Sequence, residues 1–128
     1  MPEKIGKTAP EIAGLLKNHT PTTKACFSCC GEDSFTQKLN ALNRKQVIVT
    51  GIEAHVCVYQ TVCDLLGMGY DVQVVGDAVS SRTEENKHFA IDRIKSLGGG
   101  ITSTEMILCE LIKTSQHPRF KAVMGLIK

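Results

Sequence analysis

Hydrophobic residues from position 46 onward alternate between a strand-like and a helix-like spacing. Residues 46–51, Gln-Val-Ile-Val-Thr-Gly, form a short β-branched run that ends in glycine, and residues 70–76 have the same character. Residues 101–102 are long enough only for a short strand. After each run, apolar residues recur every three or four positions, which predicts an amphipathic helix. These helices are expected at residues 54–67, 83–97, 105–114 and 118–126.

Polar residues and glycines mark the expected ends of these helices. Thr83 is predicted to cap the second helix, and Ser103 or Thr104 the third. The triple glycine at 98–100 precedes a strand. It is therefore more typical of a helix terminator than of a phosphate-binding loop, which follows a strand.

The first 45 residues have a weaker pattern. A short helix is expected at 10–16, where Pro10 suits a first turn. A brief strand is expected at 24–28. A further helix is predicted to run to about Leu42, capped by Asp33 or Ser34, with its apolar residues on one face.

Strands that alternate with helices through short connections indicate an α/β fold. The predicted architecture is a parallel sheet between two layers of helices, a three-layer α-β-α arrangement, in one domain of 128 residues. Ligands of such sheets bind beyond the carboxyl ends of the strands. The turn at residues 50–57, after the first clear strand, is therefore the first place to look for a site.

Composition excludes several classes of function. The chain is 42% hydrophobic and 22% charged, which is typical of a folded globular domain. Fifteen basic and 13 acidic residues give a net charge of +2, too even to indicate a nucleic-acid surface. Apolar runs are too short for a transmembrane helix. Six cysteines without an apolar leader favour a reducing compartment, the cytoplasm, and free thiols.

Cys57 is the cysteine whose predicted position suggests chemistry. It falls in the first turn of the helix after the strand, where unpaired backbone N–H groups and the helix dipole favour a thiolate. The same N–H groups could stabilise an oxyanion. The alternative is structural, because a free cysteine usually packs as a small buried hydrophobe.

The other cysteines and the histidines have weaker claims. Cys63 and Cys109 fall within apolar helix faces, as core residues do. Cys26, Cys29 and Cys30 form a C-x-x-C-C cluster, but a zinc site needs four ligands and no second pair is present. No metal site and no cofactor are therefore predicted. His55 is two residues from Cys57, so on a helix the two side chains would not face each other. The remaining histidines, His19, His88 and His117, are expected on the surface.

Two motifs resemble the isochorismatase-like cysteine hydrolase family. The first is Val-Thr-Gly-Ile-Glu-Ala-His-Val-Cys-Val at 49–58, and the second is Asp-Ala-Val-Ser-Ser-Arg at 77–82. Between them, Gly-Tyr-Asp-Val at 69–72 also fits, and the likeness extends over most of the chain. The turn followed by the second motif is far more specific than a lone cysteine.

The resemblance implies a function and site residues. The family hydrolyses small amides and related substrates with an Asp–Lys–Cys triad, without a cofactor. Cys57 matches the nucleophile and Lys24 the lysine. A non-proline cis peptide bond maps onto Ile52–Glu53, where it would turn the backbone N–H groups of Glu53 and Cys57 toward an oxyanion. Family members are commonly homo-oligomers, and a mitochondrial location is also compatible with the resemblance.

The triad aspartate has no counterpart before Lys24. The first aspartate is Asp33, and the earlier carboxylates are Glu3 and Glu11, both in polar, loop-like contexts. We therefore expect a sheet without the family's first two strands, with an unpaired edge and an exposed apolar face. Hydrolysis by this chain alone is expected to be weak. The alternative is a non-catalytic family member that acts by protein association.

Overall fold

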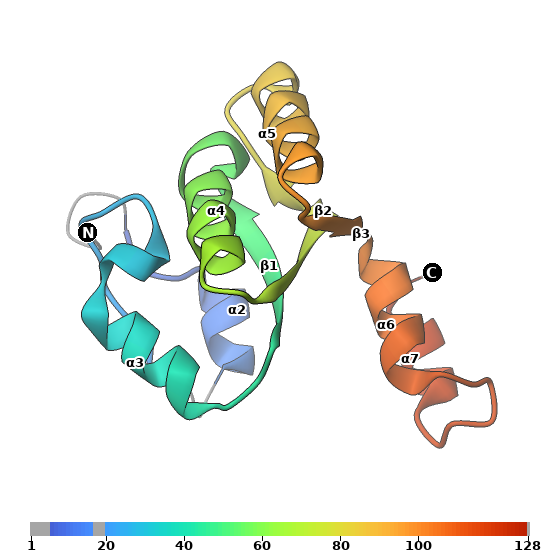
Figure 1. The fold of residues 1–128 in the computed structure, drawn as a ribbon. Coiled ribbons are helices and arrows are strands. Elements are labelled where there is room, and N and C mark those ends of the chain that lie inside the picture. Colours follow the sequence, from blue (N-terminus) through green and yellow to red (C-terminus); the bar gives the residue numbers. More distant parts are fainter. Residues whose placement is uncertain (1–5, 17–19, 128) are drawn as a thin grey trace.

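Three parallel strands form the sheet of the computed structural model, which describes residues 6–16 and 20–127 (Figure 1). They are β1 (Gln46–Ile52), β2 (Asp71–Ser80) and β3 (Gly100–Thr102), in the order β1-β2-β3. β1 pairs with β2 from Gln46↔Asp71, and β2 pairs with β3 from Gln73↔Gly100. The three strands predicted after residue 45 are confirmed. Glu3 and His19 lie outside the described residues.

β2 is longer than the sequence pattern indicates. It was expected to end at Gly76, but it continues to Ser80 and pairs with β1 a second time, through Gly51↔Val79 and Ile52↔Ser80. The register shifts between these two stretches of pairing. As a result, the residues after Ser80 emerge beside the residues after Ile52, at the carboxyl edge of the sheet.

Helices follow each strand. β1 leads into a π-helical turn, η2 (Ala54–Val58), which continues as α4 (Tyr59–Gly67). β2 leads into α5 (Glu84–Ser96), which Thr83 caps by accepting a hydrogen bond from the Asn86 amide. β3 leads into α6 (Thr104–Ile112), capped in the same way by Ser103, and the last helix is α7 (Phe120–Met124). The caps predicted for these two helices are confirmed.

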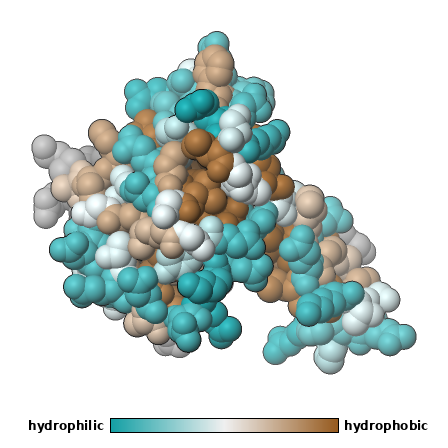
Figure 2. Space-filling model, viewed as in Figure 1, coloured by the Kyte–Doolittle hydropathy of each residue, from teal (hydrophilic) through white to brown (hydrophobic). Residues whose placement is uncertain are grey.

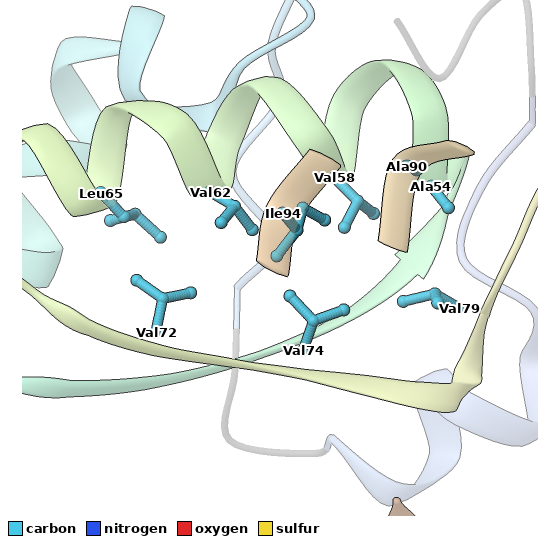
Figure 3. Close-up of a cluster of buried hydrophobic side chains, with 9 residues drawn as sticks. All are labelled: Ala54, Val58, Val62, Leu65, Val72, Val74, Val79, Ala90 and Ile94. Carbon is cyan, nitrogen blue, oxygen red and sulfur yellow. The ribbon is translucent and has the colours of Figure 1, made fainter. Parts of the chain in front are cut away.

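The hydrophobic core lies between the sheet and the helix pair α4 and α5 (Figure 3). Leu65, Val62 and Ile94 are fully buried against Val72 and Val74 of β2. These apolar residues recur at helical spacing on α4 and at every second position on β2, so each element turns one face inward. Burying a side chain of the size of Leu65 stabilises the fold by roughly 2 kcal/mol. The core thereby fixes α4, and with it the turn that precedes α4.

The opposite face of the sheet is only partly covered. Ile48 of β1 and Gln73 of β2 lie on this face with Ile107 and Leu111 of α6, around a hollow of about 280 Å³. Ile48 is 48% exposed and Ile52 is 73% exposed. In Figure 2 the arm formed by α6 and α7 stands apart from the body at the lower right. Within the described residues, β1 is an edge strand, and the expected exposed apolar face is present.

The N-terminal part contains α2 (Pro10–Leu15), η1 (Cys29–Gly31), a single 3₁₀ turn, and α3 (Asp33–Ala41). The predicted helices at 10–16 and up to about Leu42 are confirmed. The expected cap at Asp33 or Ser34 is wrong, because the N-cap position is Glu32 and no side chain makes a capping hydrogen bond there. The apolar residues of α2 are exposed, however, and Leu15 is 86% exposed.

One predicted element is wrong and another is shorter than predicted. No strand forms at 24–28, where residues 25–28 are a series of bends. Lys24 Nζ donates hydrogen bonds to the carbonyls of Cys26 and Phe27, which turns the segment back on itself and leaves no ladder for a neighbouring strand. The last helix begins at Phe120 and ends at Met124, so it is shorter than the predicted 118–126.

Candidate active site

Cys57 lies in the π-helical turn between β1 and α4. The carbonyl of Glu53 accepts hydrogen bonds from the amides of Val56 and Val58, each 3.2 Å long, so the turn is one residue wider than an α-helical turn. The side chain of Cys57 is half-buried. The sequence pattern predicted a regular helix here. The wider turn could not be predicted from the sequence, because a single extra residue leaves the spacing of hydrophobic positions nearly unchanged.

Glu53 precedes this turn and is joined to Ile52 by a cis peptide bond, at the position that the family resemblance implies. Its side chain forms a two-pronged ion pair with Arg82. Arg82 Nε donates to one carboxylate oxygen at 3.1 Å and a terminal guanidinium nitrogen donates to the other at 2.7 Å. These hydrogen bonds hold the pKa of the Glu53 carboxyl below its ordinary value, so the pair stays charged at neutral pH.

His55 forms a second contact between the same two turns. Its Nδ1 lies 3.1 Å from the hydroxyl of Ser81. The histidine is therefore engaged with the turn after β2. His55 also lines a small hollow of about 160 Å³ with Tyr59, Phe89 and Arg93, between the start of α4 and α5.

Lys24 is half-buried on the bent N-terminal segment. Its ammonium group donates to the carbonyl of Cys26 at 2.9 Å and to that of Phe27 at 2.7 Å. Both of these acceptors are backbone carbonyls of the same bent segment.

The segment that follows Lys24 is tied to α4. The amide of Cys29 donates to the Thr61 hydroxyl at 2.9 Å, and the Ser28 hydroxyl donates to the Asp64 carboxylate at 2.5 Å. Thr61 lies one helical turn beyond Cys57. The structure thus attaches the segment that carries Lys24 to the helix that carries Cys57.

The cysteine cluster contains free thiols at Cys26, Cys29 and Cys30, and Cys109, which was expected in the core, is exposed instead. Burial raises the pKa of the Cys30 thiol, against a lowering effect of the Ser28 hydroxyl. Across residues 6–16 and 20–127, no group of three or more His, Cys, Asp or Glu side chains is arranged to hold a metal ion. Nor does this part of the chain contain a helix long and apolar enough to cross a membrane.

Arg82, Ser81 and Asp64 were not singled out from the sequence as site residues. Their contacts join positions 26 to 36 residues apart, and such separations leave no periodic signal. Two signals in the sequence point to Ser81 and Arg82: they end the motif at 77–82, and they directly follow a strand that neighbours β1.

Comparison with known proteins identifies the family. The profile of the isochorismatase domain matches residues 4–106. The chain belongs to the isochorismatase family. Its parallel sheet with a helix after each strand is the isochorismatase-like α/β fold, which its structural neighbours share.

Relatives extend the comparison. The chain is 49% identical over 89 residues to the secreted isochorismatase effector Isc1 of Phytophthora sojae, which covers 70% of this chain and 42% of that protein. It is 38% identical over 127 residues to isochorismatase domain-containing protein 2 of Danio rerio, covering 98% of this chain and 63% of that one.

A solved structure also superposes well. The MAR1 ribonuclease of Caenorhabditis elegans has 41% sequence identity and a TM-score of 0.89, covering 98% of this chain and 65% of that chain. This isochorismatase-family chain therefore spans less than two thirds of the length of each of these three relatives.

Proposed function

We propose that this chain carries the nucleophile of a cysteine hydrolase that acts on small amides or related substrates. The observation that carries the proposal is the position of Cys57, half-buried in a widened turn between the carboxyl end of β1 and α4. Turns at the carboxyl ends of parallel strands are where α/β proteins bind ligands. A helix N-terminus stabilises a thiolate and presents backbone N–H groups to an oxyanion.

In the proposed reaction, the thiolate of Cys57 attacks the carbonyl carbon of the amide. The carbonyl oxygen becomes an oxyanion near the backbone N–H groups of Glu53 and Cys57. Collapse of this intermediate breaks the C–N bond, the amine leaves as it takes a proton from water, and a thioester to Cys57 remains. Water then hydrolyses the thioester and releases the acid. Lys24 contributes a positive charge that favours the thiolate.

Turnover by this chain alone is proposed to be slow. No aspartate precedes Lys24 in the sequence, so the family's third triad member has no counterpart. Removing one member of a catalytic triad costs orders of magnitude in rate. The reactive thiol should therefore be easier to detect than complete hydrolysis.

Two measurements test this function. Iodoacetamide at neutral pH, followed by peptide mapping, should modify Cys57 faster than the exposed Cys109. A panel of small amides should show little turnover, and any turnover should vanish in Cys57→Ala. If Cys57 were modified no faster than Cys109, the proposal that Cys57 is an activated nucleophile would be wrong. Robust turnover that Cys57→Ala abolishes would overturn only the expected impairment.

RNA is a competing substrate class, because the structural relative from Caenorhabditis elegans is named a ribonuclease. The nearly even charge of this chain, 15 basic and 13 acidic residues, favours a small molecule over a polyanion. Incubation of the chain with single-stranded RNA, beside Cys57→Ala, separates the two classes. Cleavage by the wild type would replace the amide with RNA as the substrate.

Association is the second candidate function, and the exposed apolar residues of edge strand β1 favour it. Ile48 and Ile52 are 48% and 73% exposed, and an edge strand offers unpaired backbone groups to another chain. We propose a homo-oligomer through this face. Light scattering should show a smaller species for Ile48→Lys than for the wild type, whereas Leu15→Lys on α2 should leave the size unchanged. Equal sizes for all three would exclude this face.

The cytoplasm is the proposed location, since six free thiols favour a reducing compartment. One relative is named a secreted effector, so localisation of the tagged chain in its own cells is a necessary test. Recovery of the chain in the culture medium would reject the cytoplasmic assignment.

A further inference from the structure

Two side-chain contacts connect the turn after β1 to the turn after β2. Arg82 makes its two-pronged ion pair with Glu53, and Ser81 meets His55 at 3.1 Å. The second stretch of pairing between β1 and β2, which ends at Ile52↔Ser80, brings these turns side by side. Glu53 and Arg82 each follow that last pair closely.

Glu53 links the ion pair to the turn around Cys57. Its carboxylate is held by Arg82, while its own carbonyl accepts the amides of Val56 and Val58, on either side of Cys57 in sequence. Any change that moves the backbone of Glu53 must therefore move the acceptor that shapes this turn.

The exposure of the pair argues for a local role. The side chain of Arg82 is 69% exposed and that of Glu53 is 27% exposed. Ion pairs with so exposed a partner contribute little to overall stability. The geometry instead suits orientation, because a guanidinium fork fixes both carboxylate oxygens at once, which a lysine ammonium does not.

We propose that Arg82 is a positioning residue, which holds the Cys57 turn in its reactive shape through Glu53. This inference rests on the proposed role of Cys57 as nucleophile. Arg82 needs no contact with substrate in this role. It also neutralises a carboxylate four residues before the nucleophile, where an unpaired negative charge would disfavour the thiolate.

Other charged groups surround the turn and must be kept constant. His55 lies on the turn itself, and Arg93 of α5 lines a hollow together with His55 and Tyr59. The test therefore changes only Arg82 and Glu53. Lys95→Gln on α5 is the matched control, since it removes another surface ion pair, 3.7 Å from Asp92, without touching either turn.

The experiment is a double-mutant cycle that measures the rate of iodoacetamide modification at Cys57, with the exposed Cys109 as reference within each protein. Arg82→Gln should slow Cys57 by about fivefold or more relative to Cys109 and move its pH profile upward. Arg82→Lys should recover part of the rate. In a Glu53→Gln background, the further change Arg82→Gln should have little effect, because Arg82 acts through Glu53.

Three results would overturn the inference. One is an unchanged Cys57 rate in Arg82→Gln, and another is an equal loss from Arg82→Gln with or without Glu53. The third is a parallel change at Cys57 and Cys109, which indicates general loosening. Each of these outcomes compares the rate of Cys57 modification in a variant with that in another variant or the wild type. The proposed nucleophile instead fails if wild-type Cys57 reacts no faster than Cys109, so the two failures are distinguishable.

Discussion

The Ser28 hydroxyl donates a hydrogen bond to the carboxylate of Asp64, 36 residues further along the chain. Ser28 is 8% exposed, and its oxygen also accepts the amide of Cys30 at 3.1 Å. One side chain thus closes the turn that follows Lys24 and attaches that turn to α4. The attachment gives the N-terminal segment a fixed position on the helix of Cys57, although no strand forms there.

Ser28→Ala should therefore loosen the segment that carries Lys24. It removes both hydrogen bonds and leaves a partly buried amide without its acceptor, so the free energy of unfolding should fall by about 1–2 kcal/mol. Urea denaturation measures this loss. Ser34→Ala is the matched control, because its hydroxyl bonds Glu32 on the surface, and it should change stability by about 0.5 kcal/mol or less. Equal losses for the two variants would contradict the anchoring role of Ser28.

Leu65→Ala should destabilise the core and α4. Leu65 is fully buried among the residues of Figure 3, so the substitution leaves a cavity. The expected loss is about 2–5 kcal/mol in the free energy of unfolding. Leu42→Ala makes the same chemical change at a 66% exposed position and should cost about 0.5 kcal/mol or less. Thermal unfolding of the two variants measures the difference. Equal unfolding midpoints would contradict the placement of Leu65 in the core.

Asp77 gives the fold a predictable pH dependence. Its carboxylate accepts the Thr104 amide at 2.9 Å and the Thr104 hydroxyl at 3.1 Å, so it holds the start of α6 against β2. The hydrogen bond from the Thr104 amide is the main cause that lowers the pKa of Asp77. Since the folded-state pKa lies below the unfolded value of about 3.9, the stabilisation is present above that value and is lost as pH falls through the folded pKa.

Asp77→Asn should consequently be less stable than the wild type near pH 7, and the difference should shrink as pH falls below about 4. Unfolding midpoints of both proteins between neutral and acid pH provide the measurement. Asp92→Asn, on the exposed side of α5, controls for the loss of one surface charge. If the difference in unfolding midpoint between the wild type and Asp77→Asn grew toward acid pH, the proposed stabilisation by the ionised Asp77 carboxylate would be wrong.

Local signals in the sequence predicted the parts of the fold that depend on local physics. The caps at Thr83 and Ser103 and the strand that begins at Gln46 follow from side-chain chemistry and short-range spacing. The second stretch of pairing between β2 and β1 could not be predicted in this way, because Gly76 and Asp77 are typical of the end of a strand. The Arg82–Glu53 pair depends on that return, so it stayed hidden until the register was known.

The expected strand at 24–28 failed for a related reason. Apolar and small residues permit a strand there, but a strand also needs a neighbour to pair with. In the described residues this segment turns instead, with the Lys24 ammonium bound to two carbonyls of its own loop. The position of Lys24 relative to α4 was therefore set by Ser28, Cys29 and their partners on the helix, which no periodic pattern encodes.

The glycines after α5 supply the sharpest test of the packing around β3. Gly98 has a φ of +90°, which ends the helix as the sequence predicted. Gly99 has a different constraint, because a Cβ at this buried position would lie 2.6 Å from Ile94 Cγ2 and 3.2 Å from the Ile94 carbonyl oxygen. Gly99→Ala must therefore displace a fully buried side chain and should cost about 1–3 kcal/mol in the free energy of unfolding.

Gly67→Ala is the matched comparison for Gly99→Ala. No atom lies within 4 Å of a Cβ at Gly67, which ends α4, and alanine favours helix over glycine. This variant should gain about 0.5 kcal/mol of stability. Denaturant unfolding of both variants should thus give changes of opposite sign. If Gly99→Ala were neutral, α5 and β3 would have room to separate, and the close contact between Ile94 and the start of β3 would be refuted.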